Sequence, residues 1–188
     1  MIERLLRRHP ATLGIVVLIL VGSVLSRGFR GPSLPVRFAL GTGYGQLVIA
    51  HRFWTPVTSV FVTNGGIELA LVAVAAVLIV GVAERLMGTA RTILAFAVTA
   101  CAGAIVGVVV QAIGGLLGEL WSRRTAEIVA LDPMTAIVGT IMTASAFAGP
   151  LWRRRIRVIT SVVVLVFLLY AGGPSDLYRA IAAVAGLA

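Results

Sequence analysis

The sequence contains no lysine and is poor in ionisable side chains of every kind. Only 12% of its 188 residues are charged, whereas 59% are hydrophobic, and the mean hydropathy is +1.04. A soluble domain averages about 25% charged residues. Apolar runs long enough to cross the hydrocarbon core of a bilayer recur along the chain. This composition argues against a soluble domain and predicts an all-α polytopic membrane protein.

Cysteine and histidine are almost absent as well. Cys101 is the only cysteine, so the chain cannot form a disulfide with itself. The two histidines, His9 and His51, both fall near predicted loops. With so few ligands of this type, we expect neither a metal site nor any other cofactor.

The net charge of +9 comes entirely from arginine. Such a bias suggests a GC-rich bacterial genome. In a chain this apolar, we expect the charge to set the orientation in the membrane and not to bind nucleic acid. The N-terminal "MIERLLRRHP" and the apolar run after it lack a small-residue cleavage site, which argues against a signal peptide. The expected location is the bacterial cytoplasmic membrane.

Six membrane spans are predicted, at residues 11–26, 57–82, 92–117, 131–149 and 158–171, with a sixth beginning at 177. Glycine, proline and aromatic residues in 27–56 predict a partly structured segment at the membrane interface. The sixth helix would be only about 18 Å long, at 1.5 Å per residue. A bilayer core is about 30 Å thick, so we expect the natural chain to continue beyond this single domain, residues 1–188.

The arginines also predict the orientation. One set of alternating loops contains nine of them and the other contains six. Because cytoplasmic loops carry an excess of arginine, the N-terminus is expected in the cytoplasm. The larger set is Arg4, Arg7, Arg8, Arg85, Arg91, Arg153, Arg154, Arg155 and Arg157.

Small residues spaced four apart mark two of the predicted spans. They are Gly103 and Gly107 in the third span, and Thr135, Gly139 and Thr143 in the fourth. Such stripes allow helix backbones to approach closely inside a membrane. The stretch "LDPMTAIVGTIMTASAFAG" is therefore expected to form a central, closely packed helix. Asp132 followed by Pro133 fits an N-cap and the first helical position.

Four short motifs occur in the order in which they occur in the rhomboid family of intramembrane proteases. They are Trp54, Thr58 and Phe61 before the second span, Glu84 and Gly88 at its end, Ala136 and Gly139 in the fourth span, and Gly186 seven residues after Arg179. From about Trp54 to its end, the chain resembles this family. The resemblance implies a six-helix rhomboid-like bundle whose sixth helix is truncated in this sequence.

The resemblance also implies that the catalytic groups of the family have been replaced. The positions of the nucleophilic serine and the glycine after it are Met134 and Thr135, and that of the sixth-helix histidine is Arg179. On the second helix, the oxyanion histidine and asparagine correspond to Glu68 and Val72. A guanidinium cannot act as a base, and Thr135 has no histidine or lysine nearby to activate it. We therefore expect no protease activity.

Charges inside predicted spans are by default functional candidates. Glu68 and Arg179 occupy two former histidine positions, so we expect them to form an ion pair across the helices. Asp176, three residues before Arg179, is the competing partner. Positions 68, 134 and 179 are expected to face a common cavity open to the outer side.

Three functions are compatible with these observations. The first is a non-proteolytic rhomboid-like domain that recognises lipid or the helix of another membrane protein. The second is an active intramembrane protease whose catalytic residues have been misaligned. The third is a membrane anchor for a larger polypeptide. The arginine cluster from Arg153 to Arg157 sets orientation and could also contact anionic phospholipid.

A looser likeness concerns the third function. The stretches "WRRRIR" and "YAGGPSDLYR" and the "LDP" helix start are similar to the N-terminal membrane part of actinobacterial proteins of the aminoacyl-phosphatidylglycerol synthase and flippase type. Those proteins join a degenerate rhomboid-like bundle to a cytoplasmic transferase domain. This likeness implies that any transferase chemistry lies in a C-terminal cytoplasmic domain outside these residues.

Overall fold

The structure is a computed structural model that describes residues 9–26 and 30–188. Within these residues the chain is helical, with ten α-helices and short π- and 3-10 segments. The only β-pairing in the same ranges is an isolated bridge between Thr42 and Ala130. The prediction of an all-α fold is confirmed.

Two helical stretches are long and apolar enough to cross a membrane. The first, Gly66–Met87, is continuous through α5 (Gly66–Ala75), the π-helix η3 (Ala76–Val80) and α6 (Gly81–Met87). The second is the 28-residue α7 (Thr89–Leu116). Gly88 joins them with a φ of 83°, a backbone conformation that glycine adopts without strain. Two further apolar helices, α2 (Pro10–Leu25) and α9 (Pro133–Ser145), are shorter.

Six spans were predicted, whereas the described residues form ten α-helices, and two of the helical stretches are long and apolar enough to cross a membrane. Each predicted span overlaps at least one helix, but several boundaries differ. Helices α2 and α7 begin and end within three residues of the prediction. The second predicted span is wrong at its start, because α4 (Thr55–Thr58) and η2 (Ser59–Phe61) precede a break, and Gly65 is extended just before α5. Helices α10 (Pro150–Tyr170) and α11 (Pro174–Ala185) begin earlier than predicted. Each begins at a proline, which suits the first helical position.

The described part of the segment predicted to be partly structured, residues 30–56, contains short helices. These are α3 (Leu34–Leu40), the π-helix η1 (Gly45–Ile49) and α4, joined by hydrogen bonds from side chains to backbone carbonyls. Trp54 Nε1 donates to Ala39 O at 3.3 Å, and Thr58 Oγ1 donates to Leu40 O at 2.8 Å. A further short helix, α8 (Leu120–Thr125), lies in the loop after α7 and was not predicted.

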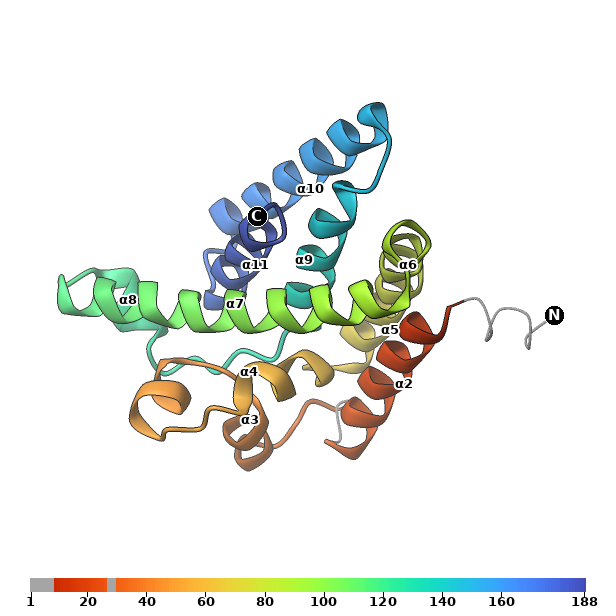
Figure 1. Cartoon of the computed structure of the whole chain (residues 1–188). Helices are drawn as coiled ribbons and strands as arrows, with labels where there is room; N and C mark the ends of the chain where they lie inside the picture. Colours follow the sequence, from red (N-terminus) through yellow and green to blue (C-terminus); the bar gives the residue numbers. More distant parts are fainter. Residues whose placement is uncertain (1–8, 27–29) are drawn as a thin grey trace.

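The centre of the molecule is formed by α7, α9 and α11, which pack closely against one another. In Figure 1, α9, α10 and α11 lie on one side of α7, and α3 and α4 lie on the other. A Cβ atom added to Gly103 would lie 2.7 Å from Tyr178 O and 2.9 Å from Thr135 Cγ2. One added to Gly107 would overlap the ring of Tyr178, and one added to Gly139 would overlap Thr99. The prediction of close packing at these glycines is confirmed.

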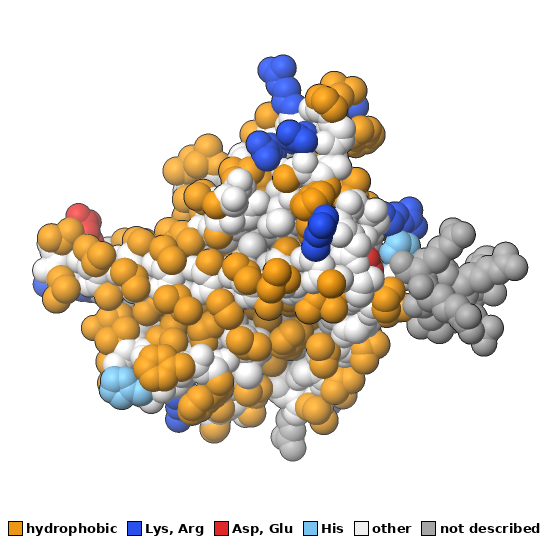
Figure 2. Space-filling view, in the orientation of Figure 1, with side chains coloured by type: hydrophobic (Ala, Val, Ile, Leu, Met, Phe, Trp, Pro, Cys, Tyr) orange, Lys and Arg blue, Asp and Glu red, His pale blue; other side chains and the backbone are white. Residues whose placement is uncertain are grey.

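Much of the outer surface is apolar. Figure 2 shows hydrophobic side chains covering most of the visible face, including the length of α7, and arginines gathered over the upper end of the molecule. Leu94, Val98 and Ile113 on α7 are 66%, 54% and 52% exposed. On α10, Val164 is the one buried residue. An apolar surface this extensive requires an apolar environment or a partner to cover it.

We expect that Gly139→Val destabilises the fold by about 1–3 kcal/mol, because the added methyl groups overlap Thr99 where α7 meets α9. Gly14→Val is the matched control, since a Cβ at Gly14 meets no atom within 4 Å. Unfolding in detergent micelles, followed by circular dichroism, measures both. Equal destabilisation of the two variants would show that α7 and α9 do not pack at Gly139.

Candidate functional site

The start of α9 is organised by Asp132. As predicted, Asp132 is the N-cap and Pro133 occupies the first turn, with Asp132 Oδ1 accepting a hydrogen bond from Met134 N at 3.2 Å. Asp132 Oδ2 also accepts from the hydroxyl of Thr135 at 2.7 Å. The backbone N–H of Asp132 donates to Ser59 O at 3.1 Å, which attaches the start of α9 to η2. The carboxylate is 4% exposed, so it requires partners for its charge.

Arg179 on α11 supplies the opposite charge. Its Nε donates to Asp132 Oδ2 at 2.7 Å and its Nη2 donates to Asp132 Oδ1 at 2.8 Å. This is a bidentate pair, the geometry in which a guanidinium and a carboxylate match best. The third nitrogen, Nη1, donates to Asp176 Oδ1 at 3.0 Å. Asp176 in turn accepts from Gly173 N and so caps α11. One arginine therefore joins two carboxylates at the starts of α9 and α11.

The prediction that Glu68 forms an ion pair with Arg179 was wrong. Glu68 does not form an ion pair with Arg179; its Oε2 accepts from Asn64 N at 3.0 Å. The physical reason is that Glu68 lies in the first turn of α5, where a carboxylate is stabilised by the free N–H groups of the helix start. The competing partner, Asp176, does bind Arg179, together with Asp132.

The other positions singled out by the resemblance are packed. Val72 is 1% exposed inside an apolar cluster that includes Ala136 and Ile137, and Met134 packs against the same cluster. Met134 therefore contributes to apolar packing. Thr135 is 4% exposed, and its side chain faces Asp132.

The cavity beside Asp132 and Thr135 is not the predicted one common to positions 68, 134 and 179. It offers only about 10 Å³ to the centre of a water molecule. Its lining includes Thr42, Ser59 and Tyr178, but not Glu68, Met134 or Arg179. This space is at the lower limit for one water and cannot admit a substrate.

The sequence predicted that Asp132 is an N-cap but did not predict that Arg179 is its main partner. A signal was present: the predicted fourth and sixth spans both begin on the same side of the membrane, so charges near their starts lie at similar depth. Asp132 precedes α9, and Arg179 lies in the second turn of α11. What the sequence did not provide was the distance between the two helices.

A second buried acid, Glu84, holds the start of α2. Its two oxygens accept from Ala11 N and Thr12 N, both at 2.9 Å, from Thr12 Oγ1 at 2.6 Å, and from Thr89 Oγ1 at 2.9 Å. Helix α2 has no side-chain cap of its own. Glu84 thus caps a helix that begins more than seventy residues away in the sequence.

The arginine cluster is divided between two roles. Arg153 Nη2 donates to Ala146 O at 2.8 Å and Arg157 Nε donates to Ser145 Oγ at 3.0 Å, at the C-terminal end of α9. A cation at this end of a helix stabilises its free carbonyls. Arg154 is exposed, and the Arg155 guanidinium lies over the Trp152 ring at 5.6 Å.

We expect Arg179→Gln to destabilise the fold by about 3–5 kcal/mol, because it leaves the buried carboxylates of Asp132 and Asp176 without their cation. Combined with Asp132→Asn, the loss should be smaller than the sum of the two single losses. Arg154→Gln, at an exposed arginine, is the control. Denaturation of all four variants in micelles measures the coupling. Strictly additive losses would contradict a direct contact between Asp132 and Arg179.

Within residues 9–26 and 30–188, no group of three or more histidine, cysteine, aspartate or glutamate side chains is placed to hold a metal ion.

Comparison of the chain with protein-family models, with curated proteins and with solved structures finds no match.

Proposed function

We propose that this chain is a multi-pass, rhomboid-like membrane domain without protease activity. Its role is to anchor a polypeptide in the membrane and to recognise membrane lipid or a transmembrane partner. Under the looser likeness described above, the polypeptide that it anchors includes a cytoplasmic transferase domain of the aminoacyl-phosphatidylglycerol synthase type.

The observation that carries the absence of protease activity is the saturation of Asp132. This carboxylate accepts four hydrogen bonds, two from Arg179, one from Thr135 and one from Met134 N. One of these hydrogen bonds comes from the Thr135 hydroxyl, but Arg179 compensates the carboxylate charge through two others, so transfer of the Thr135 proton to Asp132 would break up the bidentate ion pair. Arg179, at the position of the family's base, has each of its nitrogens bound to a carboxylate and cannot itself act as a base.

The support for membrane insertion is the exposed apolar surface together with the two long apolar helices. Arg85, at the end of α6, and the arginines at the start of α10 would lie in loops on the same side in a six-span topology. Arginine in short loops favours the cytoplasmic side. The same topology places the loop with Arg123 and Arg124 on the outer side.

The topology can be tested with single cysteines in a Cys101→Ala background. We expect cysteines at Ala90 and Arg154, both exposed, to react from the cytoplasmic side of membrane vesicles. A cysteine at the exposed Leu120 should react from the outer side. Labelling of positions 90 and 154 from opposite sides would exclude the six-span arrangement. Extraction of the protein by alkaline carbonate would exclude membrane insertion altogether.

We expect no reaction with a fluorophosphonate probe and no cleavage of a model transmembrane substrate. The reason is that no described residue at the former catalytic positions can serve as an activated nucleophile. Gel-based labelling of the purified chain measures this, with an active rhomboid protease as the positive control. Labelling that disappears in Thr135→Ala would establish the alternative, an intramembrane protease with misaligned residues.

A further inference from the structure

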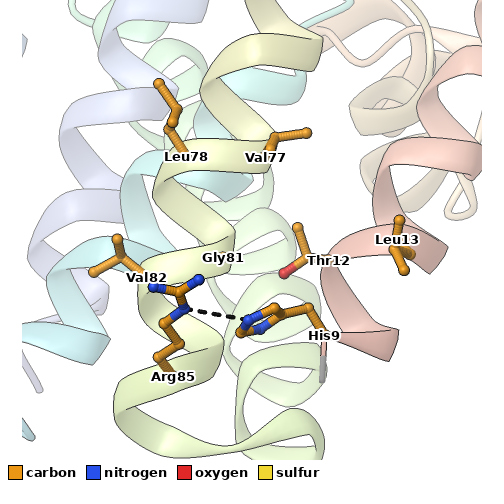
Figure 3. Close-up of a pocket in the computed structure, with 8 residues that line it drawn as sticks. All are labelled: His9, Thr12, Leu13, Val77, Leu78, Gly81, Val82 and Arg85. Carbon is orange, nitrogen blue, oxygen red and sulfur yellow. Dashed lines mark hydrogen bonds between the residues drawn. The ribbon is translucent and has the colours of Figure 1, made fainter. Parts of the chain in front are cut away.

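A groove of about 340 Å³ lies between α2 and the helix formed by η3 and α6. This volume falls within the range of about 300–1,000 Å³ typical of small-molecule sites. Figure 3 shows its two ends: Val77 and Leu78 at one end, and His9 and Arg85 at the other. Leu13 and Val82 complete the apolar walls. The groove therefore has a long apolar part and a short polar end.

The groove exists because side chains are missing or displaced at one point of the helix. Gly81 contributes no side chain, and a Cβ built there would find Thr12 as its nearest neighbour, at 3.9 Å. Val77 and Leu78 belong to the π-turn η3, a feature that frequently occurs at functional sites. Val77, Leu78 and Val82 are 52%, 62% and 46% exposed, so the apolar wall faces the surroundings of the protein.

At the polar end of the groove, Arg85 forms no ion pair with the acid beside it in sequence, Glu84. The oxygens of Glu84 accept hydrogen bonds from Ala11, Thr12 and Thr89, and Glu84 Oε2 lies 3.9 Å from His9 Nδ1. Arg85 is exposed, and its one hydrogen bond with the described part of the chain runs from Nε to His9 Nε2 at 3.2 Å. His9 Nδ1 is buried and has no hydrogen-bond partner among the described residues. Donors of Arg85 are thus available to an anion at the end of an apolar groove.

We propose that this groove binds one anionic phospholipid. An acyl chain lies along the wall formed by Leu13, Val77 and Leu78, and the phosphate accepts hydrogen bonds from the terminal nitrogens of Arg85. Such charge-assisted hydrogen bonds to phosphate are among the stronger polar contacts in proteins. A zwitterionic phospholipid fits the apolar wall equally well but brings a quaternary amine toward the guanidinium. The inference depends on the proposed membrane insertion, and it concerns a site separate from the former catalytic positions.

The experiment is native mass spectrometry of the whole chain in mild detergent, with phosphatidylglycerol or phosphatidylcholine of identical acyl chains. We expect one phosphatidylglycerol to be retained and phosphatidylcholine to be lost. Gly81→Leu fills the groove, and Arg85→Gln removes the cation. Each should weaken retention of phosphatidylglycerol by about tenfold or more, since a hydrogen bond to a charged group is lost or blocked. Circular dichroism verifies that both variants remain folded.

Two matched controls make the result specific. Gly14→Leu adds the same side chain at an exposed glycine of α2, where a Cβ meets open space. Arg155→Gln removes an exposed arginine that lies against Trp152, outside the groove. Both controls should retain phosphatidylglycerol as the unaltered chain does.

Three results would overturn the proposal: equal retention of the two lipids, unchanged retention in Gly81→Leu and Arg85→Gln, or an equal loss in Arg155→Gln. The last result would assign binding to the general basic surface. Failure of this inference is distinguishable from failure of the proposed function. Cysteine labelling that supports six spans while both groove variants retain lipid normally would reject the groove alone.

Discussion

The contact between Asp132 and Arg179 is the interaction on which the arrangement of the central helices depends. A carboxylate that is 4% exposed in an apolar protein must be compensated, and the bidentate guanidinium does this at 2.7 and 2.8 Å. The pair joins the start of α9 to α11, while Asp176 attaches the same arginine to the start of its own helix. Bringing α11 this close requires α7 to present small residues. Gly103 and Gly107, which face Tyr178 of α11, meet that requirement.

Glu84 is a second buried carboxylate that must be compensated, at another point of the bundle. It pairs with no arginine among the described residues, His9 Nδ1 lies 3.9 Å from its Oε2, and four donors satisfy it, two of them the free backbone N–H groups at the start of α2. Because a helix start carries a partial positive charge, a carboxylate from another helix can cap it. Asp132 and Glu84 therefore hold helices that are distant in sequence, and both are saturated with hydrogen bonds. Acids in this condition stabilise a fold and are poorly suited to proton transfer.

This distinction separates the two candidate sites. Around Asp132 and Arg179, polar groups are paired with one another, neighbouring apolar groups belong to the core, and the cavity beside Asp132 is about 10 Å³. At the groove beside Gly81, the space is about 340 Å³, and the cation Arg85 has donors that no described residue uses. We infer that ligand recognition by this domain would occur at the groove beside Gly81 and not around Asp132 and Arg179.

The sequence by itself determined the features that depend on neighbouring residues. Apolar runs predicted the helices, Asp132 and Pro133 predicted the start of α9, and small residues four apart predicted where helices pack closely. The tertiary structure alone decided which charges meet. Asp132 and Arg179 are 47 residues apart in the chain, and Glu84 is 72 residues from Thr12. Glu68 was the reasonable partner by position, yet the first turn of α5 satisfied it locally. Such pairings, and the groove beside Gly81, depend on the separation and rotation of packed helices, which no local pattern specifies.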